Sequence, residues 1–193
     1  EVVCWHTQHN HVTALETCDG KKYAADAFVM TAGAWTGKLL ASLNASLAMS
    51  VKPIKGQMIL YKLPKQVLAQ IVLHRGHYLI PRQDGHILCG STLEDTGFEK
   101  QTTDEAMQLL TTSAERILPL LANESPIRHW AGLRPASPNG IPYIGRMPQF
   151  KNVWINAGQF RNGLVLAPAS ATLLADLILA REPFVSPEPY QVL

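Results

Sequence analysis

Two glycine-rich segments late in the chain contain residue types that could bind a small charged molecule. The first runs from Trp130 to Pro135 and contains Arg134. An apolar strand precedes Arg134 and a proline follows it, so we expect the arginine on a short rigid loop. There its guanidinium fork can take both oxygens of a carboxylate. A solvated arginine or a structural ion pair would leave the same pattern.

The second segment runs from Asn156 to Leu164 and has the order strand, glycine turn, helix. Backbone N–H groups point outward at a helix start, and the helix dipole adds partial positive charge there. Such a start suits an anion, or the edge of a flavin that becomes negative on reduction. A plain strand-turn-helix is the alternative, and it is common in α/β proteins. Within the loop, Arg161 is either a second ligand-binding charge or a solvated side chain.

A tyrosine on a predicted strand is a third candidate. Alternation along residues 76–82 places Tyr78 and Ile80 on one face and His77 and Leu79 on the other. The Tyr78 hydroxyl could therefore reach a binding site, or the ring could simply cover the sheet.

Several other classes of function find no support in the sequence. The closest histidine pairs lack neighbouring Cys, Asp or Glu ligands, so we expect no metal site. There is no Gly-x-Ser-x-Gly elbow. A net charge of +2 without basic runs argues against nucleic-acid binding, and no apolar run is long enough to span a membrane. Three scattered cysteines favour a reduced, cytoplasmic protein.

The elements that must position these residues form three stretches. Residues 1–50 are expected to contain strands and then a helix marked by Trp35, Leu39 and Leu43. Their predicted strands are Val2–Thr7, Val12–Thr17, Lys21–Ala25 and Ala27–Thr31, and Asp19-Gly20 predicts a hairpin turn between the second and the third.

Residues 51–130 are expected to be mostly strand, with one helix over residues 104–121 that opens on a capping box of Thr102 and Glu105. The predicted strands here are Gly56–Lys62, Ile71–His74, His77–Pro81, His86–Gly90 and Ile127–Ala131. Residues 131–193 are expected to contain a buried strand, Val153–Ala157, the loop Gly158–Gly163 and a buried helix, Leu164–Ala180.

Six segments in order resemble the D-amino-acid oxidase superfamily, and within it glycine oxidase of the thiamine-pathway type. Three are the strand and glycine turn at 28–35, the Val-Lys-Pro-Ile-Lys-Gly-Gln-Met run at 51–58, and Tyr-Leu-Ile-Pro-Arg at 78–82. The others are Trp-Ala-Gly-Leu-Arg-Pro at 130–135, Gly-Ile-Pro-Tyr-Ile-Gly at 140–145, and Ala-Gly-Gln-Phe-Arg-Asn-Gly at 157–163. The resemblance extends from Val3 to about Arg181.

The resemblance implies a mixed α+β and α/β fold. A largely antiparallel substrate-binding sheet with flanking helices, residues 51–130, would interrupt a Rossmann-like FAD-binding domain made from residues 1–50 and 131–193. It implies that Arg134, Tyr78 and Arg161 bind a small amino acid. It also implies that FAD is bound non-covalently by residues that include Val3 and the run Gln159, Phe160, Arg161, Asn162, Gly163, Leu164 and Val165.

The implied reaction is oxidation of the Cα–N bond of glycine, sarcosine or small D-amino acids, giving an imino acid and hydrogen peroxide. Positioning of the substrate is the main protein contribution, so no certain catalytic acid or base is named. A D-amino-acid dehydrogenase with a non-oxygen acceptor is one alternative. A non-catalytic substrate-binding subunit that needs an FAD-domain partner is another.

One family feature is missing from the sequence. The family carries Gly-x-Gly-x-x-Gly at its N-terminus to bind the pyrophosphate, and this chain has no Gly-x-Gly. We therefore expect a fragment or split gene product that binds FAD weakly and is inactive alone. An exposed, truncated domain would also favour association between copies or a homo-oligomer.

Overall fold

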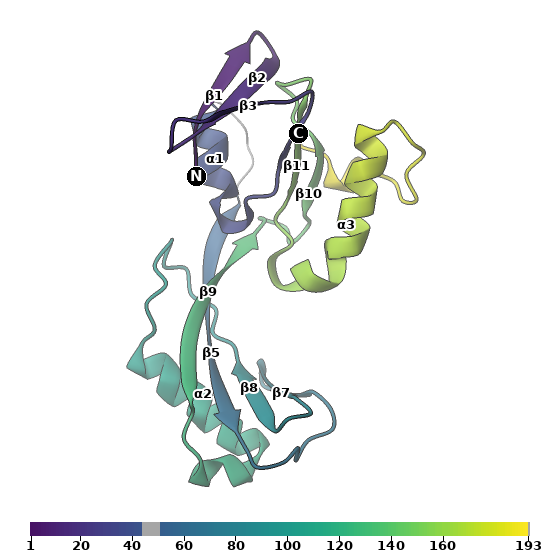
Figure 1. Cartoon of the computed structure of the whole chain (residues 1–193). Helices are drawn as coiled ribbons and strands as arrows, with labels where there is room; N and C mark the ends of the chain where they lie inside the picture. The colour runs from purple at the N-terminus through teal and green to yellow at the C-terminus, as the bar shows by residue number, and fades with distance from the viewer. Residues whose placement is uncertain (44–50, 193) are drawn as a thin grey trace. The chain divides into compact units, whose positions relative to one another are not determined.

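The computed structural model describes residues 1–43 and 51–192, and the chain divides into two compact units (Figure 1). The first unit combines Glu1–Pro53 with Arg134–Leu193, and the second is Ile54–Leu133. Mixed, largely antiparallel sheets with few helices confirm the expected fold class. The cofactor and substrate roles expected of the two parts stay proposals.

A three-stranded antiparallel sheet opens the first unit. Its strands are β1 (Val2–Gln8), β2 (His11–Thr17) and β3 (Lys22–Ala24), in that order. The turn between the last two strands contains Gly20 at a φ of 78°, a conformation that glycine adopts without strain. The predicted Asp-Gly hairpin is therefore confirmed.

The second sheet of this unit joins residues that are far apart in the sequence. Its order is β10 (Tyr143–Arg146), β11 (Val153–Ala157) and β4 (Phe28–Met30), with β11 parallel to β4. After β4 the chain forms a 3-10 turn (Gly33–Trp35) and the helix α1 (Thr36–Ser42). One buried core contains Phe28 and Met30 of β4 and Val153 and Ile155 of β11. The pairing of these two strands therefore joins the two chain segments that make up the first unit.

The side chain of Asn152 joins this core to the first hairpin. Its amide oxygen accepts a hydrogen bond from the Val12 backbone N–H at 2.9 Å, and its amide nitrogen donates to the Val12 carbonyl at 2.8 Å. The amide thus takes the place of a neighbouring strand, because it satisfies both backbone groups of a fully buried residue.

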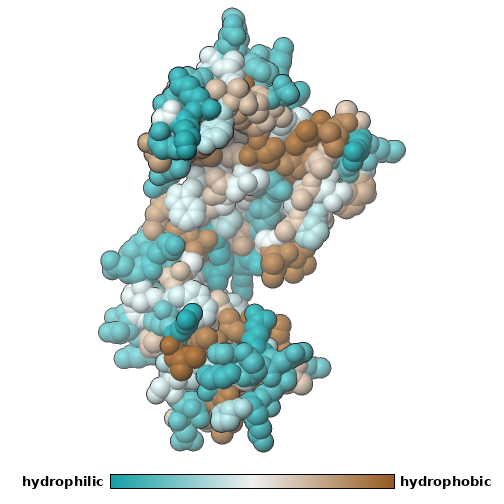
Figure 2. Space-filling view, viewed as in Figure 1, coloured by the Kyte–Doolittle hydropathy of each residue, from teal (hydrophilic) through white to brown (hydrophobic). Residues whose placement is uncertain are grey.

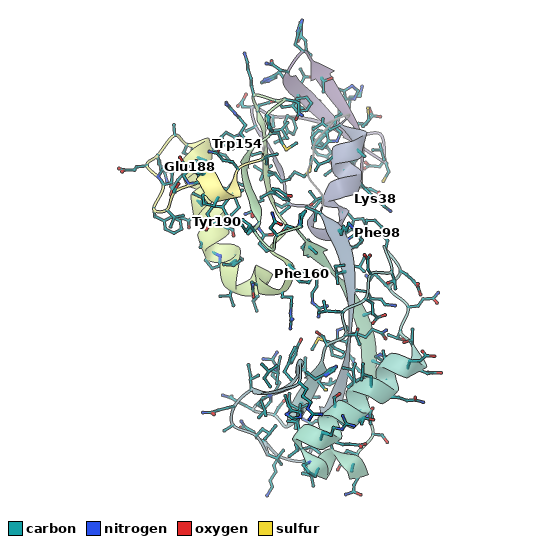
Figure 3. All side chains as sticks on the ribbon, turned by 180° about the vertical axis from the view of Figure 1, so that it is seen from behind. Lys38, Phe98, Trp154, Phe160, Glu188 and Tyr190 are labelled. Atoms are coloured by element: carbon teal, nitrogen blue, oxygen red, sulfur yellow. The ribbon has the colours of Figure 1, made fainter. Side chains whose placement is uncertain are left out.

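The helix α3 (Gly163–Ile178) packs on β10 and β11 and is less buried than we expected. Apolar residues lie on almost every side of this helix, and that pattern predicts a buried helix. Of its described residues, however, only Ser170, Leu173 and Leu174 are buried. Trp154 and Tyr190 pack against the same buried side, and Figure 3 labels both beside the helix. A 3-10 turn, Phe160–Asn162, precedes α3, and another, Glu188–Tyr190, lies in the tail.

The second unit is a five-stranded sheet with one helix on one face. The helix is α2 (Asp104–Ile117), followed by a 3-10 turn (Pro119–Asn123). It packs on alternate residues of the sheet, among them Ile59, Leu79 and Ile87. The strand order is β6 (Val72–His74), β7 (His77–Pro81), β8 (His86–Gly90), β5 (Lys52–Lys62) and β9 (Arg128–Ala136).

Both ends of α2 differ from the prediction. Thr103, not Thr102, caps the helix, and its hydroxyl accepts from the Ala106 N–H at 3.3 Å. The helix stops before Pro119, which begins the next turn, because a proline there has no N–H to donate and its ring clashes with the preceding turn.

Two strands of the last third also differ from the prediction. β9 continues through Pro135 to Ala136, so Arg134 lies on a strand and not on a loop. This is possible because β9 is at the edge of its sheet, where a missing N–H breaks no ladder. β10 was not predicted, because glycine and proline surround it in the sequence.

Candidate functional site

The glycine turn in front of α3 has a conformation that few sequences allow. Gly158 follows β11 with a φ of 87°, and a Cβ there would lie 3.1 Å from the Cβ of Ser137. Both the dihedral angle and the close approach require glycine. Local hydrogen bonds hold the next residues. The side-chain amide of Gln159 donates to the side chain of Asn156, and the backbone carbonyl of Gln159 accepts from the Asn162 N–H at 3.0 Å.

Phe160 is the strained residue of this loop. Its φ is 48°, in the left-handed region that a bulky side chain seldom adopts. Figure 3 labels its ring at the start of α3. Such outliers gather at ligand-binding loops, where the surroundings fix an unfavourable backbone.

The first turn of α3 exposes apolar side chains at the positive end of the helix. Leu164 is 93% exposed and Val165 82% exposed, and Figure 2 shows hydrophobic surface where α3 begins. No acidic residue lies in this turn, and no side chain caps it. Free N–H groups and the dipole favour a negative group there, beside an apolar surface. This combination suits a flat, largely apolar ligand with one negative edge.

Arg134 belongs to the same unit as this loop, and a backbone pairing connects the two. Ala136, two residues beyond Arg134 on β9, forms an isolated antiparallel bridge with Gln159. The strand that carries Arg134 therefore ends alongside the loop that carries Arg161. Arg134 is half-buried and Arg161 is exposed. Both predicted arginines thus belong to one neighbourhood of the first unit.

Tyr78 belongs to the second unit, on the sheet face turned away from α2. Its neighbour Leu79 is buried under α2, as the predicted alternation requires. Across the ladder Tyr78 pairs with Gly90. A Cβ at Gly90 would lie 3.1 Å from the Tyr78 hydroxyl oxygen and 3.0 Å from Cε of Met58. Gly90 therefore leaves the space that the phenol fills.

Val3 lines a cavity of about 660 Å³ in the first unit. The same cavity touches Ala32 and Trp35, which follow β4. The structure thus brings together two segments that are distant in the sequence, the start of β1 and the glycine turn after β4. Ala32 and Trp35 were not among the predicted site residues, although the Thr-Ala-Gly-Ala-Trp run that contains them is part of the family resemblance.

The predicted residues therefore form three groups. Arg134, Arg161 and the loop before α3 share one neighbourhood, and Val3 lies at a separate cavity of the same unit. Tyr78 lies in the other unit, and its pairing with Arg134 around one substrate stays a prediction. Among the described residues, no group of three His, Cys, Asp or Glu side chains could hold a metal ion. No helix of the described chain is long and apolar enough to cross a membrane.

Comparison with known proteins identifies the family. The model for "DAO: FAD dependent oxidoreductase" matches residues 1–177. The chain belongs to this family. A glycine oxidase of Pseudomonas aeruginosa is 53% identical over 190 residues, which are 98% of this chain and 51% of that protein.

Solved structures show the same relationship. The crystal structure of glycine oxidase from Geobacillus kaustophilus superposes with a TM-score of 0.92 at 28% identity, over 100% of this chain and 51% of that one. The crystal structure of iminodiacetate oxidase from Chelativorans sp. BNC1 superposes with a TM-score of 0.89 at 29% identity, over 98% of this chain and 52% of that one. The chain spans about half the length of the curated relatives it matches.

Proposed function

We propose that this chain supplies substrate recognition to an FAD-dependent amino-acid oxidase of the glycine oxidase kind. The enzyme would oxidise the Cα–N bond of glycine, sarcosine or a small D-amino acid to an imino acid, with release of hydrogen peroxide. The observation that carries the proposal is the bridge between Ala136 and Gln159. It joins the strand that carries Arg134, for which we propose carboxylate binding, to the loop before an exposed, apolar helix start in a member of this family.

The residues present fit a flavin at the start of α3. The free N–H groups of the first turn can receive the negative edge of the ring, and Leu164 and Val165 can cover its apolar surface. We propose that Gln159, Phe160, Arg161, Asn162, Gly163, Leu164 and Val165 hold the ring. Val3, at its separate cavity, would contact another part of the cofactor. Bound FAD would supply the acceptor for the hydride from the substrate Cα.

Arg134 would hold the substrate by its carboxylate. A guanidinium makes two parallel, charge-assisted hydrogen bonds to a carboxylate, each contributing about 1.5–3 kcal/mol. Such a pair fixes the orientation of Cα as well as its position, which matters where positioning is the main contribution to the rate. Tyr78, on the face of its own sheet turned away from α2, would also help to bind the substrate through its hydroxyl group.

Arg161 would act on the protonation state of the substrate. The amine must lose its proton before the Cα–N bond can be oxidised, and positive charges nearby disfavour an ammonium group. Two guanidinium groups in one neighbourhood would therefore lower the pKa of the bound amine. No side chain has to act as a base in this scheme, because water can take the proton.

Turnover of the flavin-loaded enzyme tests the proposal. Glycine and sarcosine should each reduce oxygen and release one peroxide per amine consumed, whereas acetate should release none. Peroxide formation also separates an oxidase from a dehydrogenase that uses another acceptor. Absence of both flavin binding and amine oxidation in the protein that carries this chain would exclude the proposal.

Three further expectations belong with this proposal. A cytoplasmic location is supported by Cys4, Cys18 and Cys89, which are free thiols. Association between copies is supported by exposed apolar residues outside the proposed sites, among them Tyr23, Val29 and Phe184. Weak FAD binding by this chain alone is supported by its lack of Gly-x-Gly.

A further inference from the structure

The second unit has a cavity whose residues the proposed oxidation does not use. Its volume is about 580 Å³, within the range of small-molecule sites. Leu60 and Leu88 line it and face each other across β5 and β8. The residues next to them in sequence, including Ile59 and Ile87, are buried under α2. The cavity is therefore on the sheet face turned away from the helix.

Two arginines, Arg82 and Arg128, line this cavity. Neither Arg82 nor Arg128 forms an ion pair or hydrogen bond through its side chain with any described residue. The nearby Asp84 pairs with His86 of the cavity wall, with its carboxylate 2.8 Å from Nδ1, and not with either arginine. Two guanidinium groups at one cavity carry two positive charges that the described protein leaves unbalanced.

The other side of the cavity is apolar and aromatic. Trp130 lines it together with Leu60 and Leu88, and the indole is 36% exposed. An exposed indole next to cations offers a stacking surface for a flat group. His86 also lines the cavity, and its bond to Asp84 fixes the orientation of the ring.

This cavity is separate from the position of Tyr78 on the same face. Tyr78 pairs with Gly90 and Ile80 pairs with Leu88, while Arg82 donates its backbone N–H to His86. Arg82 is thus four residues along the chain from Tyr78, or about 13 Å at the usual rise per residue. A ligand at the arginines therefore need not touch the proposed substrate tyrosine.

We propose that this cavity binds a phosphate monoester with an aromatic body. Arg82 and Arg128 would take the phosphate oxygens, because guanidinium forks match them and two cations balance a dianion. Trp130, Leu60 and Leu88 would contact the aromatic body. This site is additional to the amino-acid site and does not depend on the oxidase proposal.

Calorimetric titration of the flavin-loaded enzyme with phenyl phosphate tests the site. We expect saturable binding that glycine does not displace. The double variant R82Q/R128Q should bind at least about tenfold more weakly, a loss of about 1.4 kcal/mol. The matched control R116Q removes one exposed charge from α2, on the opposite face, and should bind as the unchanged enzyme does.

Two further titrations complete the design. The conservative variant R82K/R128K keeps the charges without the forks and should weaken binding less than R82Q/R128Q. Inorganic phosphate should bind at least about tenfold more weakly than phenyl phosphate, because it cannot contact Trp130. Failure of phenyl phosphate to bind, its displacement by glycine, or equal affinity in R82Q/R128Q and the unchanged enzyme would each overturn the proposal.

Discussion

Tyr78 and Gly90 face each other across β7 and β8, and a Cβ at Gly90 would lie 3.1 Å from the tyrosine hydroxyl oxygen. We expect Gly90→Ala to displace the phenol and to raise the KM for glycine about tenfold, the cost of about one hydrogen bond. The effect on kcat should be smaller. Steady-state kinetics with glycine measure both values.

A double-mutant cycle separates this effect from general damage. In a Tyr78→Phe background the hydroxyl is already absent, so Gly90→Ala should raise KM much less. Equal effects of Gly90→Ala in both backgrounds would show that the glycine does not act through the tyrosine hydroxyl.

The start of α3 allows helix stability to be separated from cofactor binding. Val165→Glu places a carboxylate at the positive end of the helix, where it should add about 0.3–1 kcal/mol of stability to the apoprotein. The same charge would face the negative edge of the flavin, so FAD affinity should fall about tenfold or more. Thermal unfolding of the apoprotein and titration with FAD measure the two effects.

Leu179→Glu is the control, because Leu179 is an exposed apolar residue just beyond the other end of α3. This substitution should leave FAD affinity unchanged. Normal FAD binding by the Val165→Glu protein would show that the start of α3 is not part of the cofactor site.

Lys55 is the main buried cation of the second unit. Its side chain is 2% exposed, and its Nζ lies 2.9 Å from Glu94 and 3.2 Å from the Gln101 carbonyl. Lys55→Met leaves the partly exposed Glu94 carboxylate without its cation but with its hydrogen bonds from Thr92 and Gln57, so we expect a loss of about 1–3 kcal/mol in the free energy of unfolding. Urea denaturation measures the loss. Lys52→Met, at an exposed position of the same strand, should have little effect, and a similar loss there would contradict the account.

The pKa of Glu94 predicts how the stability of the protein depends on pH. Burial alone would raise the pKa of its carboxyl, but hydrogen bonds from Thr92, Lys55 and Gln57 outweigh burial and hold the pKa below its ordinary value of 4.5. A lowered folded-state pKa gives stability that is fully present above 4.5 and is lost as the pH falls through the folded value.

Denaturation of Glu94→Gln at a series of pH values tests this. The loss of stability on acidification should be shallower than in the unchanged protein. Asp95→Asn, at an exposed neighbouring position, serves as the matched control. Identical slopes for Glu94→Gln and the unchanged protein would exclude a role for this carboxylate.

Local patterns in the sequence predicted the elements whose causes are local. Alternation predicted that Leu79 and Tyr78 lie on opposite faces of their strand, and an Asp-Gly pair marked the hairpin at Gly20. The sequence also identified the glycine turn at Gly158, although the approach of Ser137 that makes glycine necessary there was not visible.

Features that depend on distant parts of the chain were missed. Asn152 satisfies the backbone of Val12, 140 residues away, and nothing local marks it. β9 continues through Pro135 because it is an edge strand, which depends on the order of the whole sheet. The exposure of α3 likewise depends on what packs against it, and an apolar helix sequence alone does not determine this.

Arg134 provides the most direct test of the central claim, that this chain positions an amino acid by its carboxylate for oxidation. The measurement is the loss of flavin absorbance when the enzyme is mixed with glycine without oxygen, as a function of glycine concentration. Arg146→Gln, an exposed arginine of β10, is the control.

We predict that Arg134→Ala will need at least about a hundredfold more glycine for half-maximal reduction, the loss of about 3 kcal/mol of bidentate pairing, and that Arg146→Gln will behave as the unchanged enzyme does. Reduction of the Arg134→Ala enzyme at the same glycine concentrations as the unchanged enzyme would contradict the account.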